Sequence, residues 1–263
     1  MSIYWILFIV ALCISAIGWK RFLYFISLGY GFSIAACAIT MAIIYWQNLT
    51  LPTIILCLLL LVYGCRLGGF LLIREIKSAN YRKALSENVN EKRYPVFVTL
   101  MIWISCAFLY MAEVSPVAAR LDNGVADNVW DWVGVAVMAA GIILESAADK
   151  QKSAAKKIDP KRFVDTGLYR MVRCPNYFGE VVIWTGCFLV CIGAGCSWWQ
   201  WLISGLGYAG IVYIMFSGAR RLETRQNKNY GSDPVYQEYV RRVPILIPFL
   251  PIYSVERHKW LRG

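Results

Sequence analysis

Seven long apolar runs constrain this chain more than any other feature of its sequence. Each run can cross a hydrocarbon core of about 30 Å as a helix, which rises by about 1.5 Å per residue. A bilayer tolerates no exposed sheet edge, and the chain has no alternating strand pattern, so the spans should be helices. We predict them at residues 2–18, 22–46, 51–73, 94–112, 130–149, 176–196 and 198–218. The expected fold class is all-α, a polytopic membrane helical bundle.

The composition agrees with a membrane-embedded chain. Hydrophobic residues make up 59% of the 263 positions, and the mean hydropathy is +0.51. The opening residues MSIYWILF lack a positive segment, and Lys20 and Arg21 follow the first apolar run. We therefore expect this run to be retained rather than cleaved as a signal peptide. The whole of 1–263 is expected to form a single integral membrane domain.

The distribution of Lys and Arg predicts the orientation of the chain. Residues 74–93 hold six, 149–176 hold eight and 219–263 hold nine, whereas 47–52 hold none and 113–131 hold one against four acidic residues. By the positive-inside rule, the N-terminus lies outside and the C-terminus in the cytosol. This bias, with attraction to anionic membrane lipids, explains the net charge of +11 without a nucleic-acid partner. We expect the bacterial inner membrane, or the endoplasmic reticulum membrane if the chain is eukaryotic.

Cysteine and histidine usage indicates neither a disulfide framework nor a metal site. Eight of the nine cysteines lie in apolar spans, and Cys187, Cys191 and Cys196 have helical rather than zinc-ribbon spacing. We expect them to be small, reduced core residues. The only histidine is His258 near the end of the chain, so no histidine dyad or zinc site is expected in the membrane core.

The glycines of span seven resemble a dinucleotide fingerprint but predict helix packing. Gly205, Gly207 and Gly210 are spaced as G-x-G-x-x-G, which binds a dinucleotide only between a strand and a helix. Within a membrane span, small residues instead allow helices to approach closely. Gly64 and Gly68 in span three favour the same interpretation.

The polar stretch RFVDTGLYRMVRCPNYFGE at 162–180 opens directly into span six. Pro175 suits the first position of a helix, where its missing N–H costs nothing. The helix start beside Arg170 and Arg173 is then a candidate anion site. Asn176 and Glu180 are one turn apart and share a face. The alternative interpretation is that the two arginines only mark the cytosolic side of the span.

Ionisable side chains near the cytosolic ends of four spans form a second candidate set, because such groups are costly in lipid. They are Arg66, Glu145, Asp149, Glu180 and Glu223. Tyr63 lies three residues before Arg66 on the same face of its span, so the two are candidate partners. Interhelical salt bridges, with Arg66 paired to Glu145 or Glu180, would explain single members. A cytosol-facing polar pocket between spans five, six and seven and the 150–175 loop explains the whole set.

The stretch GLYRMVRCPNYFGE resembles the GLWRYTRHPNYFGE-type signature of bacterial DUF1295 proteins. These are members of the steroid 5-alpha-reductase C-terminal domain superfamily, which is 3-oxo-5-alpha-steroid 4-dehydrogenase-like. The resemblance continues through ESAADKQK at 145–152, SGARRLE at 217–223 and DPVYQEYVRRVPILIPFLP at 233–251, and more loosely through YGCRLGGFLL at 63–72. It defines a C-terminal-like region over 60–253.

This resemblance implies an NADPH-dependent oxidoreductase that acts on a CH–CH group. The substrate would be a lipophilic small molecule, a steroid-like or other enone with an activated C=C bond. Hydride would reach the β-carbon while a donor stabilises the charge that develops on the carbonyl oxygen. Tyr63 matches the catalytic tyrosine. The implied cofactor-binding residues are Arg66, Glu145, Asp149, Arg170, Arg173, Asn176, Tyr177, Glu180, Glu223, Arg225 and Tyr239.

The sequence departs from the family pattern at two places. Cys174 replaces the signature histidine, and no Asp or Glu precedes Glu75, whereas the steroid reductases use a glutamate from an early helix. A membrane methyltransferase of the isoprenylcysteine carboxyl or phospholipid type is an alternative, because such enzymes carry a similar R-H-P-x-Y-x-G block. They bind S-adenosylmethionine, which has no phosphate. A non-enzymatic membrane protein is the second alternative.

Overall fold

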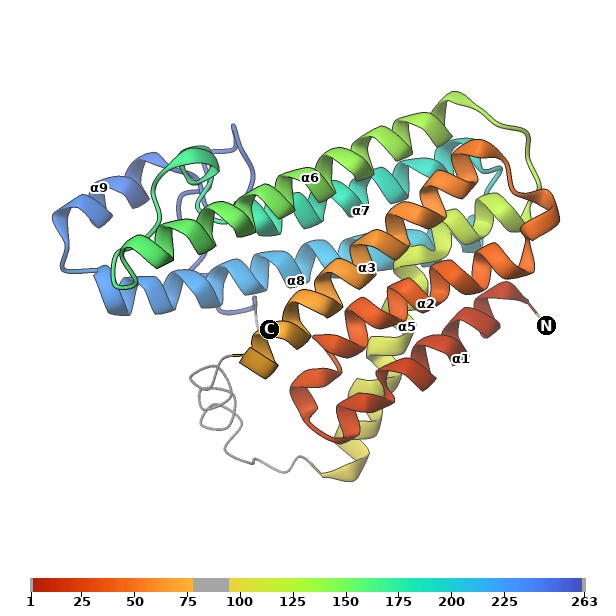
Figure 1. Ribbon diagram of the computed structural model, residues 1–263, viewed down its shortest axis with the longest axis horizontal. Helices are drawn as coiled ribbons and strands as arrows, with labels where there is room; N and C mark the ends of the chain where they lie inside the picture. Colours follow the sequence, from red (N-terminus) through yellow and green to blue (C-terminus); the bar gives the residue numbers. More distant parts are fainter. Residues whose placement is uncertain (1, 78–94, 262–263) are drawn as a thin grey trace. The chain divides into compact units, whose positions relative to one another are not determined.

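The computed structural model describes residues 2–77 and 95–261, apart from the side chains of Arg74, Glu75 and Lys77. Every element in this part of the chain is helical (Figure 1). The α-helices are α1 (Ile3–Ser15), α2 (Leu28–Ile44), α3 (Leu51–Lys77), α5 (Val96–Asp122), α6 (Val129–Ile158), α7 (Pro175–Gly193), α8 (Trp198–Tyr230) and α9 (Pro234–Arg242). Short 3₁₀ segments are η1 (Ala16–Trp19), η2 (Phe22–Tyr24), η3 (Trp46–Asn48) and η4 (Gly167–Arg170).

The helices have the length and composition of membrane spans. Within the described residues, six are long and apolar enough to cross a bilayer, and Ile3–Trp19 is a shorter apolar helix. The predicted all-α, multi-pass membrane architecture is confirmed. The inside–outside orientation stays a prediction, and its first basic segment, 74–93, lies mostly outside the described residues.

Several helices differ in length from the predicted spans. α5 continues to Asp122 instead of 112, α6 to Ile158 instead of 149, and α8 to Tyr230 instead of 218. Hydropathy detects only the apolar part of a helix, whereas polar residues continue it wherever neighbouring elements hold them. In contrast, α7 ends at Gly193 rather than 196, because Gly195 adopts a positive φ of 61° and turns the chain. Cys196 therefore lies in the short connection between α7 and α8 and not in a helix.

The chain divides into two compact units, and the first comprises Met1–Val135 and Cys187–Tyr208. Its helices approach each other at glycines. A Cβ on Gly64 of α3 would lie 2.4 Å from the Gly31 oxygen of α2. A Cβ on Gly207 of α8 would lie 2.5 Å from the Ala112 backbone of α5. The packing interpretation of Gly64 and Gly207 is confirmed, whereas a Cβ on Gly205 would meet no atom of another element within 4 Å.

A buried ion pair closes the turn between α5 and α6 in this unit. Arg120 is 3% exposed, and its Nε donates to Asp131 Oδ1 at 3.0 Å and to Asp131 Oδ2 at 3.1 Å. Its Nη2 donates to Asp127 Oδ1 at 2.9 Å. Asp131 Oδ2 also accepts from the backbone N–H of Asn128. These charges, which the sequence places in an outer loop, hold the ends of two helices together.

The second unit comprises Ala136–Gly186 and Ala209–Gly263. It contains most of α6 and α7, the C-terminal two thirds of α8, and α9 with the segment that follows it (Figure 1). α6 and α7 pack closely, since a Cβ on Gly179 would lie 2.7 Å from the Glu145 nitrogen. The C-terminal segment then covers the start of α7. Arg173 N–H donates to the Pro244 oxygen at 2.9 Å, and Cys174 N–H donates to the Ile245 oxygen at 3.0 Å.

Candidate functional site

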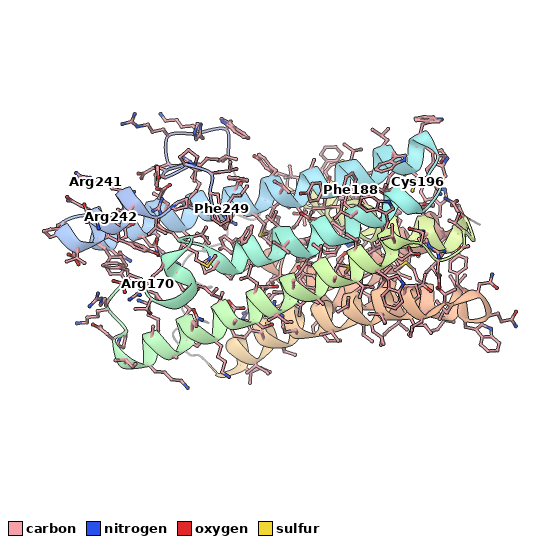
Figure 2. All side chains as sticks on the ribbon, turned by 90° about the horizontal axis from the view of Figure 1, so that it is seen from above. Arg170, Phe188, Cys196, Arg241, Arg242 and Phe249 are labelled. Carbon is pink, nitrogen blue, oxygen red and sulfur yellow. The ribbon has the colours of Figure 1, made fainter. Side chains whose placement is uncertain are left out.

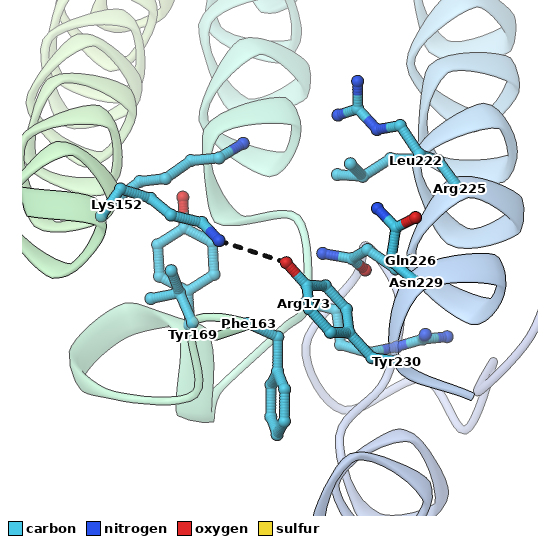
Figure 3. A pocket seen from close by; sticks show the side chains of 11 residues that line it. Lys152, Phe163, Tyr169, Arg173, Leu222, Arg225, Gln226, Asn229 and Tyr230 are labelled. Atoms are coloured by element: carbon cyan, nitrogen blue, oxygen red, sulfur yellow. Dashed lines mark hydrogen bonds between the residues drawn. The ribbon is translucent and has the colours of Figure 1, made fainter. Parts of the chain in front are cut away.

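The second unit contains a cationic cavity of about 290 Å³ (Figure 3). α6, the loop before α7 and the C-terminal half of α8 supply its walls. The lining residues are Lys152, Lys156, Phe163, Val164, Tyr169, Arg173, Leu222, Arg225, Gln226, Asn229 and Tyr230. Four of these 11 described residues are cationic and none is acidic. Such a lining attracts a phosphate or carboxylate ligand.

Arg173 is the most constrained cation of this cavity. It is 2% exposed, and its Nη2 donates to Glu223 Oε1 at 2.8 Å and to the carbonyl of Tyr253. The other oxygen of Glu223 accepts the N–H of Val255 at 2.9 Å. Nε and Nη1 of Arg173 are buried without a hydrogen-bond partner. The guanidinium is thus anchored on one side and retains donors that a ligand can use.

Lys156 has a different role, because the protein already uses its hydrogen bonds. Its ammonium donates to the carbonyls of Pro160 and Arg162 and to the Tyr230 hydroxyl at 3.3 Å, the bond drawn in Figure 3. An ammonium has three N–H donors, so these bonds account for all of them. Lys156 therefore closes the loop after α6 and contributes mainly its charge to the cavity.

Aromatic side chains pack around one wall of the cavity. The Phe163 ring centroid lies 5.8 Å from that of Tyr230, 5.1 Å from Tyr236 and 5.4 Å from Tyr239. The Tyr239 hydroxyl donates to the Tyr169 carbonyl at 2.7 Å. Burial raises the pKa of Tyr236 to about 12, although Arg173 opposes the shift, and burial also raises the pKa of Tyr239. These phenols stay protonated at neutral pH and act as hydrogen-bond donors.

The structure brings together only part of the predicted site. Arg173 and Arg225 line the cavity, and Glu223 lies behind it as the partner of Arg173. Tyr239 supports the wall, whereas Arg170 is exposed and does not line the cavity (Figure 2). The remaining predicted residues of this unit lie outside the lining: Glu145, Asp149, Asn176, Tyr177 and Glu180.

Two of these residues have packing roles. Glu145 is 4% exposed on α6 beside Gly179 of α7. A Cβ on Gly218 of α8 would lie 3.3 Å from the Tyr177 ring, so this ring packs on α8. The start of α7 lies under the C-terminal segment, and the cations of the cavity come from α6, from Arg173 before α7 and from α8.

Sequence reasoning missed most of the α8 wall. Leu222, Arg225, Gln226 and Asn229 recur at helical spacing and therefore share one face. Lys152 and Lys156 are likewise one turn apart on α6. The helical spacing of these residues would have predicted this wall of the cavity. The prediction requires a helix that continues past residue 218, where the predicted span ended.

Tyr63 and Arg66 lie on α3 in the first unit, one turn apart as predicted. Tyr63 is completely buried, and its hydroxyl donates to the Tyr30 hydroxyl at 2.9 Å. The Tyr30 ring also lies 5.1 Å from that of Tyr110. Neither Tyr63 nor Arg66 lines a described cavity.

The first unit has an apolar cavity of its own, of about 730 Å³. Residues of α1, α5 and α8 and Ser2 form it: Ser2, Tyr4, Trp5, Phe8, Ile104, Ser105, Phe108, Met111, Trp199 and Ile203. Its size falls within the range of roughly 300–1,000 Å³ that is typical of small-molecule pockets. This unit therefore offers apolar surface, and the second unit offers cations.

The helices and the two cavities define a multi-pass membrane protein with an anion-attracting pocket in one unit and an apolar one in the other. The family model described as "Protein of unknown function (DUF1295)" matches residues 13–243. The chain belongs to this family, which confirms the resemblance seen in its sequence.

Curated relatives extend this relationship to named reductases. An uncharacterized protein of Schizosaccharomyces pombe is 29% identical over 173 residues, which cover 57% of this chain and 49% of that protein. A steroid 5-alpha-reductase of Arabidopsis thaliana is 24% identical over 131 residues, covering 47% and 45%. The 3-oxo-5-alpha-steroid 4-dehydrogenase 1 of Rattus norvegicus is 25% identical over 171 residues, covering 60% and 61%. The chain thus spans about half to three fifths of each relative, and no solved structure matches it.

Proposed function

We propose that this protein is a membrane-embedded oxidoreductase that uses NADPH to reduce the activated C=C bond of a steroid-like or other lipophilic enone. The cationic cavity carries the proposal, because its four basic residues lie within the region 60–253 that resembles the reductase family, and two of them, Lys152 and Arg173, lie in its matching blocks. The names of two relatives point to the same reaction class. A lipophilic substrate is in keeping with an integral membrane protein.

The residues of the cavity fit the phosphate-bearing part of a dinucleotide. Lys152 and Arg225 supply charge, and Arg173 supplies two buried donors without a hydrogen-bond partner. Gln226 and Asn229 add amide groups that can bond a ribose or a carboxamide. A volume of about 290 Å³ suits part of such a cofactor rather than its full length. S-adenosylmethionine has no phosphate and would leave this charge unmatched.

Bound NADPH would supply a hydride to the electron-poor carbon of the substrate. In this proposal, Lys152, Arg173 and Arg225 hold the phosphates, and Tyr63 donates a hydrogen bond where negative charge develops on the substrate carbonyl. The Tyr63 hydroxyl donates to Tyr30 in the structure. Substrate binding would therefore have to exchange this partner for the carbonyl oxygen.

Thermal-shift titration of the purified protein tests the cofactor directly. We expect NADPH to raise the unfolding temperature, NADH to do so only at concentrations about tenfold higher or more, and S-adenosylmethionine to have no effect. Stabilisation by S-adenosylmethionine but not by NADPH would reject the reductase in favour of the methyltransferase. Stabilisation by neither would reject the cofactor assignment.

Two arginines of α8 provide a matched pair for the binding site. Arg225 lines the cavity, whereas Arg221 is one turn earlier, exposed, and not part of the lining. Arg225→Ala should weaken NADPH binding about tenfold, the effect of losing one charge-assisted contact. Arg221→Ala should leave the affinity unchanged. Equal effects of the two substitutions would show that only the general positive charge of the helix matters.

A further inference from the structure

The segment that follows α9 returns to the end of a membrane span. It pairs with the residue before α7, because Cys174 N–H donates to the Ile245 oxygen at 3.0 Å. The chain then forms a loop that closes where Ile245 N–H donates to the Ile252 oxygen at 2.8 Å. Since α7 is one of the helices that are apolar enough to cross a bilayer, this loop lies beside the end of a span.

The end of the described chain lies against α8, beside the apolar part of that helix. Arg220 fixes it, because Nε donates to the Glu256 oxygen at 3.1 Å and Nη1 to the Leu261 oxygen at 3.3 Å. The Tyr213 hydroxyl donates to the Trp260 oxygen at 2.9 Å, and the centroids of these two rings are 6.1 Å apart. Tyr213 belongs to the apolar run that we predicted to end at residue 218. Trp260 is therefore held beside this run and not beyond it.

The loop and the chain end expose large apolar side chains. Phe249 is 95% exposed and Trp260 is 65% exposed, and Leu250 is exposed as well (Figure 2). Among the described residues other than glycine, Phe249 alone has a positive φ, of 67°. The Cβ atom disfavours this conformation, and a side chain so exposed has few contacts within the protein that could offset the strain. An apolar environment outside the protein would offset it.

Two cations accompany these apolar residues. Arg257 and Lys259 are exposed and lie within three residues of Trp260. Residues 246–261 contain one acidic side chain, Glu256, which accepts a hydrogen bond from Asn227 Nδ2 at 2.7 Å. Trp is enriched where a bilayer meets water, and Lys and Arg at this level are attracted to anionic headgroups. The surface therefore fits an anionic membrane better than a second copy of the chain, which would bring the same cations against each other.

We propose that residues 246–261 form a membrane-binding surface at the basic ends of the spans. Phe249, Leu250 and Trp260 insert among the lipids, and Arg257 and Lys259 bind anionic headgroups. The predicted orientation makes this surface part of the cytosolic side. The proposal goes beyond the reductase assignment and does not depend on it, because none of these five residues lines the cationic cavity.

Photo-crosslinking of the full-length protein in lipid vesicles tests this surface. The photoreactive analogue p-benzoylphenylalanine replaces Phe249, Trp260 or, as a matched control, Val235. Val235 is also exposed but lies on α9, which begins after α8 has continued about 18 Å past residue 218, at a rise of about 1.5 Å per residue. After irradiation, mass spectrometry of the intact protein should find phospholipid adducts at positions 249 and 260 and none at 235.

Two results of this experiment would overturn the proposal. One is that lipid adducts are no more frequent at positions 249 and 260 than at 235. The other is that these two positions crosslink to a second copy of the chain, which would make the surface a dimer interface. Because each position is tested in a separate variant, one variant that fails to fold leaves the other to decide.

Lipid composition tests the role of the cations. In vesicles with equal amounts of phosphatidylcholine and phosphatidylglycerol, adducts at position 260 should contain an excess of phosphatidylglycerol, roughly fivefold for each cation. Arg257→Gln combined with Lys259→Gln should remove this excess. Arg241→Gln combined with Arg242→Gln is the matched control, because these arginines are exposed at the end of α9, and it should leave the excess unchanged (Figure 2). Equal amounts of the two lipids in the adducts of the otherwise unchanged chain would overturn the assignment of an anionic partner.

Discussion

Two buried arginines, one in each unit, differ in what they do with their hydrogen-bond donors. Arg120 of the first unit bonds both oxygens of Asp131 and one oxygen of Asp127. Arg173 of the second unit bonds Glu223 and a backbone carbonyl through Nη2 alone, and its Nε and Nη1 have no hydrogen-bond partner. Of the two, only Arg173 lines a described cavity.

This difference separates a structural ion pair from a candidate binding site. A buried donor without a partner costs free energy, roughly 1–3 kcal/mol, unless a ligand or water satisfies it. Arg120 avoids this cost by pairing within the protein, whereas Arg173 keeps donors beside a cavity that also contains Lys152 and Arg225. Burial of an arginine therefore does not by itself identify a ligand site. A buried arginine becomes a candidate ligand site when it has N–H donors without a hydrogen-bond partner and lines a cavity.

The largest expected effect is a loss of stability in the first unit. Asp131→Ala leaves the Arg120 charge buried with only the partly exposed Asp127, and breaking such a pair costs about 3–5 kcal/mol. We expect a lower unfolding temperature in detergent and an unchanged NADPH affinity of the folded fraction. A clear loss of NADPH affinity would contradict the distinction between the two arginines, because it would show that the Arg120 ion pair also affects cofactor binding.

The tyrosine pair tests whether the first unit contributes to the chemistry. Tyr63→Phe should lower turnover roughly 10²–10³-fold, the usual effect of losing one donor to a developing oxyanion. NADPH affinity should stay the same, because the ring and its packing remain. The measurement is steady-state turnover of an enone substrate at saturating NADPH. Near-normal turnover would show that Tyr63 has no catalytic role and is a core residue that is hydrogen-bonded to Tyr30.

Matched Arg→Lys substitutions sharpen the comparison directly. Arg173→Lys keeps the charge beside Glu223 but removes Nε and Nη1 as donors, so NADPH should bind about 10-fold to 100-fold more weakly. Arg120→Lys removes the Nε–H that both oxygens of Asp131 accept, and it should lower stability without changing NADPH affinity. Titration calorimetry and thermal unfolding of both variants measure the two effects. The opposite pattern would reverse the roles assigned to the two arginines.

The smallest expected effect concerns Cys174, which replaces the signature histidine. Burial raises the pKa of the Cys174 thiol from 9.0 to about 12. The folded state then binds this proton more tightly than the unfolded state, so stability is full below about pH 9 and falls as the pH rises toward 12. From pH 8 to pH 10, the wild type should lose about 1.4 kcal/mol more stability than Cys174→Ala. Identical pH profiles of the two proteins would show that Cys174 does not titrate in this way.

Sequence reasoning identified part of the candidate site. The helical period and the family blocks placed Arg173 and Glu223 near the predicted cytosolic ends of their spans, and the structure puts both in or directly behind one cavity, together with Arg225. It did not distinguish Arg170, which is exposed, from Arg173, which is buried and only three residues later. Arg170 ends the 3₁₀ segment η4 and is exposed, whereas Arg173 follows this segment and is buried. The stretch before α7 has no apolar periodicity from which this difference could be predicted.

The amino-acid sequence alone predicts the all-helical, multi-pass architecture, because helices satisfy the backbone hydrogen bonds of long apolar runs in lipid and the chain has no alternating strand pattern. It also determined the family, through ordered blocks of polar residues. The tertiary structure is needed to show that Lys152, Gln226 and Asn229 line the same cavity as Arg173. The helical period predicts which residues share a face of one helix, but not which faces of different helices meet. That choice depends on close contacts such as Gly179 against Glu145 and on the C-terminal segment that covers the start of α7.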